Sequence, residues 1–412
     1  MALLVQKYGG TSVGSVERIA NVARRALAAR REGHEVVVIV SAMSGETNRL
    51  LRLAREVSTL PDARELDALA ATGEQVSAAL TALAIQAQGG RARSLLGHQV
   101  RVLTDSAFTK ARIKAVDASA ITRALHDGGI AVVAGFQGVD ETGNITTLGR
   151  GGSDTTAVAI AAALGPCACE IYTDVEGVYT TDPGICPSAR KIERISYAEM
   201  LELASLGAKV LQLRSVELAM KYEVPVHVRS SFSENPGTWV VGEEAGLEAI
   251  TVTGVAYDRN EARVQLLGVA DRPGAAAAIF GELAAQNISV DMIVQSPAGP
   301  NRGAVDLAFT IVKTDLERVR GLLEGVAQRS GASGVDIDEN IGKVSIVGLG
   351  MRSHAGVAAR MFRLLADEGI NIQAISTSEI KVSCLVAEKY VELAVRTLHD
   401  GFGLGQPRSP AG

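Results

Sequence analysis

The stretch TTLGRGGSDTTAVAIAAALG, residues 146–165, joins residues that bind anions to a helix-forming run. From Thr155 onward the run is apolar enough to predict a helix that is buried on almost every side. Gly151 and Gly152 stand where that helix begins, although glycine forms helices poorly, and they leave backbone N–H groups bare. Arg150 adds a forked cation suited to a carboxylate or a phosphate, and the SDT that follows the glycines supplies candidate helix caps. The stretch therefore predicts an anion site at a helix N-terminus.

Two further glycine-bearing loops follow predicted strands. KYGG at 7–10 places Lys7 at the end of a strand, before two glycines that let another group approach the backbone closely. VSAMSGETNRL at 40–50 carries Ser41 and Thr47 in a comparable loop. Ligands of open α/β sheets bind at the carboxyl ends of the strands, so the three loops together predict one ligand site. The GRGGSD stretch matches neither G-x-x-x-x-G-K-[ST] nor G-x-G-x-x-G, so neither common nucleotide fingerprint explains it.

Residues 1–245 show the alternation of elements that positions such loops. The apolar runs LLVQKY, HEVVVIVSAM, GIAVVAGF and CEIYTDV predict strands, and VDETGNIT predicts a hairpin with its turn at Gly143 and Asn144. An amphipathic helix is expected after GGTSVG, and its buried face would hold Val16, Ile19, Ala23 and Leu27. Strands that alternate with helices predict an α/β domain with a mainly parallel sheet.

The chain repeats itself in residues 246–412. VQLLGVADRPGAAAAIFGELAAQNISVDMIVQS at 264–296 is similar to VSIVGLGMRSHAGVAARMFRLLADEGINIQAISTS at 344–378, and one two-residue insertion reconciles their spacing. Each copy predicts a strand, a loop, a helix and two strands, followed by a second helix. We therefore expect two small α+β domains, at about 264–335 and 344–403, that pair side by side because units this small bury little core alone.

Composition excludes several functional classes. The 412 residues are 47% hydrophobic and 4% aromatic with a net charge of −5, and no Lys/Arg-rich run stands out, which argues against nucleic acid as a partner. MALLVQKYGG lacks the basic region of a signal peptide, and no apolar run reaches the length of a bilayer span, so a cytoplasmic protein without a membrane partner is expected. The four cysteines show no usual zinc spacing and are interpreted as buried reduced thiols: Cys167, Cys169, Cys186 and Cys384.

An ordered set of motifs resembles the aspartate kinase family. The motifs are KYGGTSV at 7–13, SAMSGETN at 41–48, TGE at 72–74, GRGGSDTTA at 149–157, YTDVEGVYTTDP at 172–183 and GAKVL at 207–211. The tandem repeat resembles that family's pair of ACT domains, which sense amino acids. The resemblance implies the amino-acid kinase fold with two ferredoxin-like ACT domains. It also implies phosphorylation of the side-chain carboxylate of L-aspartate by ATP with Mg²⁺, the committed step toward lysine, threonine and methionine.

The resemblance also assigns roles to single residues. Lys7 would contact the transferring phosphoryl group, and Asp154 would hold that lysine in place. Arg150 would bind a carboxylate of aspartate. The other residues expected around aspartate are Ser41, Thr47, Glu74, Gly151, Gly152 and Ser153. Those expected around the nucleotide are Lys7, Tyr8, Gly9, Gly10, Thr173, Asp174, Tyr179, Asp182 and Lys209, with Gly9 and Gly10 giving N–H groups to the phosphates. No protein ligand of Mg²⁺ is singled out.

One departure from the family pattern concerns the nucleotide. After TTDP the family usually has an arginine that reaches the nucleotide, and this chain has Gly184. Either Lys209, Arg190 or Lys191 takes over that contact, or nucleotide binding is weaker.

The ACT repeats imply regulation by an amino acid, lysine or threonine or both together. The residues expected to line one effector site are Asp271, Gly274, Ala275, Ser289, Val290, Asp291 and Gln295. Met351 stands where the second copy should repeat Asp271, so we expect the two copies to bind ligands unequally. A homo-oligomer through the ACT domains is implied, and the sequence leaves a separate smaller regulatory subunit open.

Two alternatives remain at the level of the sequence. The first is another enzyme of the amino-acid kinase fold, such as a glutamate or acetylglutamate kinase, although the tandem ACT repeats argue against it. The second is a non-catalytic amino-acid sensor with a decayed kinase domain, although Lys7, Arg150 and Asp154 are intact.

Overall fold

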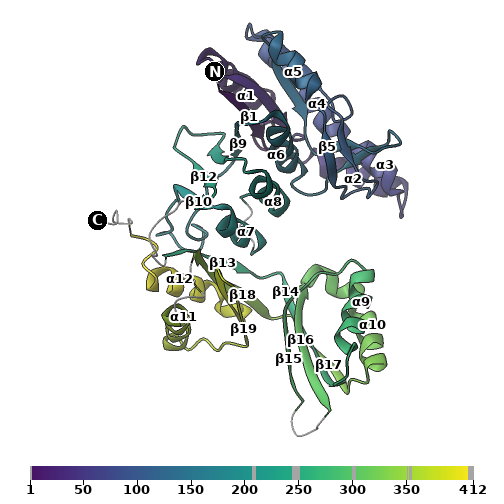
Figure 1. Cartoon of the computed structure of the whole chain (residues 1–412), viewed down its shortest axis with the longest axis vertical. Helices are drawn as coiled ribbons and strands as arrows, with labels where there is room; N and C mark the ends of the chain where they lie inside the picture. The colour runs from purple at the N-terminus through teal and green to yellow at the C-terminus, as the bar shows by residue number, and fades with distance from the viewer. Residues whose placement is uncertain are drawn as a thin grey trace. The chain divides into compact units, whose positions relative to one another are not determined.

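The computed structural model describes residues 2–206, 210–243, 251–298, 303–349, 351 and 355–406. Their contacts fall into two units (Figure 1). The first contains 2–179, 191–205 and 210–243, and the second contains 180–190, 206, 251–298, 303–349, 351 and 355–406. The domain boundary expected at 245–246 lies outside the described residues.

A mainly parallel sheet of eight strands organises the first unit, in the order β10-β12-β11-β9-β1-β2-β6-β3. The four strands predicted from apolar runs are confirmed: β1 (Leu3–Tyr8), β2 (Glu35–Val40), β6 (Ile130–Ala134) and β9 (Ala168–Thr173). The others are β3 (Ala92–Leu95), β10 (Arg194–Ser196), β11 (Val226–Ser230) and β12 (Thr238–Val241). From β1 the chain builds toward β2 on one side and later returns to β9 on the other, so the strand order reverses at β1. Open α/β sheets bind ligands at such a reversal.

Helices cover both faces of this sheet. Tyr8 and the alternate residues of β2 and β6 form one core with α1 (Val16–Arg31) and α4 (Thr72–Ala87). The opposite face meets α6 (Gly152–Leu164), which is buried almost all round as predicted. The face predicted for α1 is confirmed except at Val16, which is 70% exposed because it occupies the first turn of the helix. The remaining helices are α2 (Glu46–Val57), α3 (Ala63–Ala70), α5 (Ser119–His126), α7 (Tyr197–Ser205) and α8 (Leu213–Tyr222).

A second, four-stranded sheet supplies the loop that carries Arg150. Its strands are β4 (Val102–Thr104), β5 (Ile113–Val116), β7 (Gln137–Val139) and β8 (Ile145–Thr147), in the order β5-β4-β7-β8. The predicted hairpin is β7–β8, and Gly143 takes the left-handed φ of 88° that its turn requires. The Asp140 carboxylate accepts hydrogen bonds from the backbone N–H groups of Thr142 and Asn144 and thereby closes the turn.

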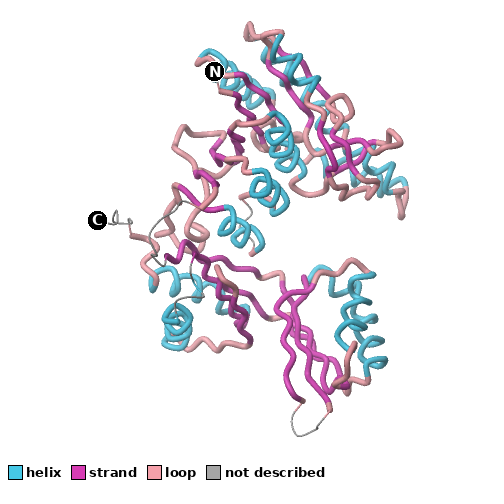
Figure 2. The backbone as a smooth tube through the Cα atoms, in the orientation of Figure 1, coloured by secondary structure: helices cyan, strands magenta, loops and turns pink. Residues whose placement is uncertain are grey.

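The second unit holds the two repeats, each a four-stranded sheet with helices on one face (Figure 2). The first consists of β14 (Glu261–Ala270), α9 (Ala275–Ala285), β15 (Val290–Pro297), β16 (Ala304–Val312), α10 (Lys313–Ser330) and β17 (Gly334–Asp338). The second consists of β18 (Ile341–Leu349), α11 (Ala355–Asp367), β19 (Ala374–Thr377), β20 (Lys381–Ala387), a short 3-10 helix (Glu388–Tyr390) and α12 (Val391–Gly401). The predicted order of elements in each copy is confirmed.

Strand β13 (Thr251–Asp258) shows that the first repeat is inserted within the second, so the two are not simply arranged one after the other. It precedes the first repeat in the chain but pairs antiparallel with β18 in the sheet of the second repeat. The first repeat is therefore inserted between the edge strand of the second repeat and the rest of its sheet. The internal comparison of the two copies could not reveal β13, because this strand has no counterpart at the same place in the first copy.

One helical stretch, Ala63–Ala87, is long and apolar enough to cross a membrane by length and composition, so the expectation that no stretch reaches that length was wrong by this criterion. The stretch consists of α3 and α4, and half of its apolar window is buried within the protein. It also carries two buried carboxylates, Asp67 and Glu74, in contact with neighbouring loops. A core helix of a folded domain explains these features.

Candidate active site

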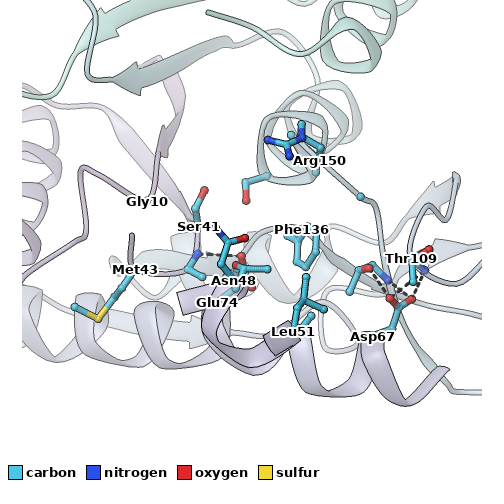
Figure 3. Close-up of a pocket in the computed structure, with 18 of the residues that line it drawn as sticks. Gly10, Ser41, Met43, Asn48, Leu51, Asp67, Glu74, Thr109, Phe136 and Arg150 are labelled. Carbon is cyan, nitrogen blue, oxygen red and sulfur yellow. Dashed lines mark hydrogen bonds between the residues drawn. The ribbon is translucent and has the colours of Figure 1, made fainter. Parts of the chain in front are cut away.

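A cavity of about 610 Å³ opens where β1 and β2 end and α6 begins (Figure 3). It brings together most of the residues predicted around aspartate and the phosphates. Those that line it are Lys7, Gly10, Ser41, Thr47, Glu74, Arg150, Gly151, Gly152, Ser153 and Asp154. Motifs separated by up to 147 positions, from Lys7 to Asp154, thus form one site.

The Lys7 ammonium forms an ion pair with Asp154 at the wall of this cavity. Lys7 Nζ lies 2.6 Å from Asp154 Oδ1, and each side chain is only 10% exposed. Lys7 belongs to β1 and Asp154 to the first turn of α6, so both ends of the pair are held by regular structure. A buried cation stays in place only when it is paired in this way. The pair therefore fixes one positive charge at the point where the strand order reverses.

Two glycines in these loops are required by space. A Cβ atom on Gly10 would lie 2.9 Å from the carbonyl oxygen of Ala42, so the first and second loops touch only because Gly10 has no side chain. Gly151 has a left-handed φ of 70°, and a Cβ there would overlap the side chain of Gln212. These glycines set the close packing of the loops around the cavity.

Some details of the predicted helix start were wrong. Gly151 is the N-cap residue of α6, and no side chain caps the helix, so neither Ser153 nor Asp154 plays the expected capping role. The GRGGSD loop also follows β8 of the small sheet, whereas the other two loops follow strands of the parallel sheet. The sequence pattern could not separate the two sheets, because both supply short strands that end in glycine-bearing loops.

Tyr8 and Gly9, both predicted at the nucleotide, already have partners within the protein. The Gly9 N–H donates to the Tyr172 carbonyl at 3.1 Å, so it is already used, and Gly10 is the loop glycine that lines the cavity. The Tyr8 ring is fully buried and stacks on Tyr172 with ring centroids 4.7 Å apart. The Tyr8 side chain therefore packs in the hydrophobic core between the sheet and α1 and α4.

Glu74 is a buried carboxylate with one unused oxygen. Its Oε1 accepts a hydrogen bond of 2.9 Å from the Ala42 backbone N–H, whereas its buried Oε2 has no hydrogen-bond partner among the described residues. The side chain comes from the first turn of α4 and is only 3% exposed. Burial raises the pKa of Glu74 to about 7, and the hydrogen bond from Ala42 only partly opposes that rise. The buried Glu74 carboxylate would be stabilised in its charged form by a cation bound in the cavity.

Arg150 is exposed and makes no hydrogen bond or ion pair with any of the described residues. Figure 3 shows it across the cavity from Glu74 and Asn48. An unpaired guanidinium on one side and a carboxylate in need of a cation on the other are complementary to a molecule that carries both charges. An α-amino acid is such a molecule.

Asp67, which the sequence analysis did not single out, binds the segments that flank the loop carrying Arg150. Its carboxylate is 1% exposed and accepts hydrogen bonds from the Thr109 N–H, the Thr147 N–H and the Thr147 hydroxyl at 2.6–3.0 Å. Burial, the largest effect, raises the pKa of Asp67 in spite of these bonds. Arg214 supports the same segment, because its guanidinium donates to the Leu148 and Ala111 carbonyls at 2.6 and 2.9 Å. No local motif marks either residue, since their partners lie 42 to 103 positions away.

We expect Asp67→Asn to lower kcat/KM for the amino-acid substrate by on the order of 10-fold or more. The carboxylate accepts hydrogen bonds through both oxygens, whereas an amide can accept through only one, so the loop that carries Arg150 would be held less well. The KM for ATP should change little. Steady-state kinetics with each substrate varied in turn measures both effects. Asp105→Asn is the matched control, because Asp105 also accepts backbone N–H groups in a neighbouring loop but does not line the cavity. An Asp67→Asn enzyme with unchanged kinetics would remove Asp67 from the account.

The residues predicted around the nucleotide base and sugar are only partly brought together. Thr173 ends β9 beside the Gly9 loop, and Asp174 follows it on the surface. Tyr179 is half-buried, and its hydroxyl contacts Glu176. Asp182 belongs to the second unit, where its carboxylate accepts hydrogen bonds from the Gly184 N–H at 2.8 Å and the Tyr257 hydroxyl at 2.9 Å. Lys209 lies outside the described residues.

The position of Gly184 is exposed, and its N–H is used within its own turn. Of the residues proposed to replace the missing arginine, Lys191 donates its ammonium group to the Pro236 carbonyl. Arg190 is half-buried, and its Nε has no hydrogen-bond partner among the described residues. Arg190 is therefore the freer of the two cations.

The predicted effector residues divide into two groups in the first repeat. Asp271, Gly274, Ala275 and Gln295 line a small cavity of about 170 Å³ at the start of α9. Ser289, Val290 and Asp291 do not line it. Asp291 instead pairs with Lys343 of β18 at 2.8 Å.

Met351, the counterpart of Asp271 in the second repeat, is 5% exposed and belongs to the hydrophobic core of that repeat. The two copies therefore differ in structure where the first has its cavity.

The cavity of the first unit suits two anions together with a metal ion that arrives on a phosphate. Each of its three carboxylates already has a partner in the protein. Asp154 pairs with Lys7, Asp67 accepts N–H groups of Thr109 and Thr147, and Glu74 accepts the Ala42 N–H. Mg²⁺ commonly keeps water and substrate phosphates as ligands, so the lining fits an ion that the nucleotide carries in. Lys7, Arg150 and the loop backbone supply positive potential, which favours the binding of anions in the cavity.

The amino acid kinase family matches residues 2–230, and ACT domains match residues 264–328 and 344–402. A kinase domain of this fold with a regulatory ACT pair agrees with the sheet and cavity described above.

Several similar proteins are named aspartokinases. An aspartokinase of Pseudomonas aeruginosa is 56% identical over 409 residues, 99% of this chain and 99% of that protein. An aspartokinase of Corynebacterium glutamicum is 49% identical over 408 residues, 98% of this chain and 97% of that protein. The crystal structure of E. coli aspartokinase III with aspartate and ADP superimposes with a TM-score of 0.82 at 27% identity and covers 97% of this chain and 99% of that one. The chain belongs to the aspartate kinases, enzymes that transfer phosphate to aspartate.

Proposed function

We propose that the cavity of the first unit binds L-aspartate beside MgATP and that the side-chain carboxylate of aspartate attacks the γ-phosphorus. The product is 4-phospho-L-aspartate. The observation that carries this proposal is one cavity holding a fixed cation at Lys7, an unpaired cation at Arg150 and an enclosed carboxylate at Glu74. The solved relative with aspartate and ADP supports the same pair of ligands.

The reaction needs positive charge more than it needs a base. The nucleophile is a carboxylate, which is already ionised at pH 7, so no group has to remove a proton. Two like charges about 4 Å apart repel by about 4 kcal/mol at an effective dielectric near 20. Lys7, held by Asp154, would neutralise charge on the transferring phosphoryl group, and Mg²⁺ bound to the phosphates would supply more. The bond from phosphorus to the nucleotide oxygen breaks as the acyl phosphate bond forms.

Arg150 and Glu74 would orient aspartate for this attack. Arg150 would bind a carboxylate through its forked N–H groups, with Thr47 and Ser153 as neighbouring hydroxyls. The free Oε2 of Glu74 would accept the substrate ammonium group, which supplies the cation that this buried carboxylate lacks. Charges of both signs at fixed places would leave only one orientation of the side chain facing Lys7.

The pH dependence follows from the pKa of Glu74. In the free enzyme this pKa is about 7, so below that pH most molecules carry a neutral Glu74 that binds an ammonium group poorly. We therefore expect kcat/KM for aspartate to rise with pH to a plateau above about 7 and to fall toward tenfold per pH unit below it. Glu74→Gln should have a low kcat/KM without this inflection, whereas an inflection that survives the substitution would assign it to another group.

The effector is proposed to be lysine or threonine, bound at the small cavity of the first ACT repeat. Support comes from the lining residues Asp271 and Gln295 and from a solved relative, E. coli aspartokinase III with lysine and aspartate, at a TM-score of 0.76 and 27% identity. Inhibition by these end products would place the enzyme at the first step of lysine, threonine and methionine synthesis. We further propose a cytoplasmic homo-oligomer that pairs through ACT domains, with a smaller regulatory subunit as the alternative assembly.

Effector identity and number can be measured together. Aspartate-dependent turnover is followed with lysine, threonine and the two combined, and calorimetry counts the sites for the inhibitor that acts. Because Met351 packs in the core where Asp271 lines a cavity, the two repeats should not bind equally, and fewer than two equal sites per chain are expected. Two equal sites per chain would refute the asymmetry, and inhibition by neither amino acid would refute the effector assignment.

A further inference from the structure

Three side chains that commonly bind metals converge in the second unit, and none of them lines the two cavities described above. Cys186 Sγ lies 3.3 Å from His399 Nδ1, and His399 Nδ1 lies 3.6 Å from Asp400 Oδ1. The three ligand atoms all lie within 4.8 Å of one another. Cys186 comes from the segment 180–190, and the other two come from the last turn of α12.

The distances match the edges of a tetrahedral zinc site. With Zn–S near 2.3 Å and Zn–N or Zn–O near 2.1 Å, the edges of a tetrahedron are about 3.4–3.6 Å. The sulfur–nitrogen separation is 3.3 Å and the nitrogen–oxygen separation is 3.6 Å, each within about 0.3 Å of the corresponding tetrahedral edge before any metal has drawn the ligands together. A thiolate, an imidazole and a carboxylate form a ligand set that favours Zn²⁺ over Mg²⁺ or Ca²⁺.

The surroundings hold two of the ligands in position. Thr180 Oγ1 lies 2.9 Å from His399 Nε2, which leaves Nδ1 to face Cys186, and the same hydroxyl oxygen accepts the Arg190 N–H at 2.9 Å. Ser188 Oγ lies 3.2 Å from Cys186 Sγ, where it can donate to a thiolate. Partners of this kind orient the ligands of metal sites and tune their basicity.

Burial and exposure also suit a metal that binds from solvent. Cys186 and His399 are 3% and 0% exposed, whereas the Asp400 side chain is 72% exposed. The metal would reach the buried pair past the exposed carboxylate, and a water would complete the tetrahedron.

We propose that Cys186, His399 and Asp400 bind one Zn²⁺ per chain. Binding would release the thiol proton, because the ligand is the thiolate. The ion would join the segment 180–190 to α12 and stabilise the folded second unit, since it binds the folded chain and not the unfolded one. The alternative is a metal-free hydrogen bond from the Cys186 thiol to His399 Nδ1.

The experiment uses the untagged full-length chain, reduced, treated with chelator and dialysed. Co²⁺, as a coloured substitute for Zn²⁺, should produce thiolate-to-metal absorption in the near ultraviolet that saturates at one ion per chain, and added Zn²⁺ should abolish the absorption. Zn²⁺ should also raise the Tm of the wild-type chain. Failure of either the Co²⁺ band or the Tm shift overturns the proposal.

The variants test each ligand. Cys186→Ser should lose the thiolate absorption. Asp400→Asn, a surface change that leaves the core intact, should weaken Zn²⁺ binding by roughly tenfold or more in competition with a chromophoric chelator. Cys167→Ser is the matched control, because that half-buried thiol lies in the other unit, and it should bind Co²⁺ as wild type does. Absorption that survives in Cys186→Ser, or that disappears in Cys167→Ser, would contradict the assignment.

Discussion

Replacing Lys7 with methionine is expected to lower kcat by on the order of 10²-fold or more, the effect of removing one preorganised group that stabilises transition-state charge. The Lys7 ammonium lies 2.6 Å from Asp154 at the cavity wall, and a strand and a helix hold the two ends of this ion pair. Methionine fills similar space but leaves the phosphoryl charge without this partner. Initial rates at saturating aspartate and MgATP measure the loss.

A second substitution separates the lost charge from the damage to its partner. Lys7→Met leaves the Asp154 carboxylate enclosed without a cation, which itself destabilises the fold. In the double variant Lys7→Met with Asp154→Asn, stability should recover but kcat should not. Lys114→Met, which removes an exposed lysine paired with Glu141, is the surface control. A Lys7→Met enzyme within about threefold of wild-type kcat would remove Lys7 from the chemistry.

Replacing Arg150 with alanine is expected to lower kcat/KM for aspartate by roughly 10- to 100-fold, the usual effect of losing a charged hydrogen bond. The KM for ATP should change by much less, because Arg150 is proposed to bind aspartate; Figure 3 shows it across the cavity from Glu74. The folded chain should tolerate the change, since Arg150 is exposed and makes no hydrogen bond or ion pair with the described residues. Kinetics with each substrate varied in turn distinguish the two constants.

Arg150→Lys shows whether the fork of the guanidinium matters. A lysine keeps the charge but cannot make two parallel hydrogen bonds to one carboxylate, so it should recover only part of the lost kcat/KM. Full recovery would mean that charge alone suffices. If the KM for ATP rises in Arg150→Ala and the constant for aspartate does not, Arg150 belongs to the nucleotide side.

Local patterns predicted the strands and the loops well because each depends on neighbouring residues. The run EVVVIV is buried on both faces as β2, and the Gly10 and Gly151 loops lie where two strands and a helix meet. The closeness of Lys7 to Asp154 followed from the family resemblance, since 147 positions separate them in the sequence.

The features that the sequence analysis missed all depend on contacts between residues that lie far apart in the sequence. Asp67 accepts hydrogen bonds from residues 42 and 80 positions away, and nothing local marks that carboxylate as buried. Strand β13 joins β18, more than 80 positions later, across an inserted domain. The Gly9 N–H was expected to face a phosphate, but a carbonyl of the neighbouring strand already accepts it.

The most direct test of the central claim is the formation of an acyl phosphate, trapped with hydroxylamine, from ATP, Mg²⁺ and an amino acid. We predict aspartyl hydroxamate that requires all three components, with no comparable product when glutamate replaces aspartate. Arg150 and Glu74 would hold the α-carboxylate and ammonium groups of the amino acid, so that only a side chain of the length of aspartate would reach Lys7 correctly. No hydroxamate from folded, active-site-intact protein, or equal product from glutamate, would contradict it.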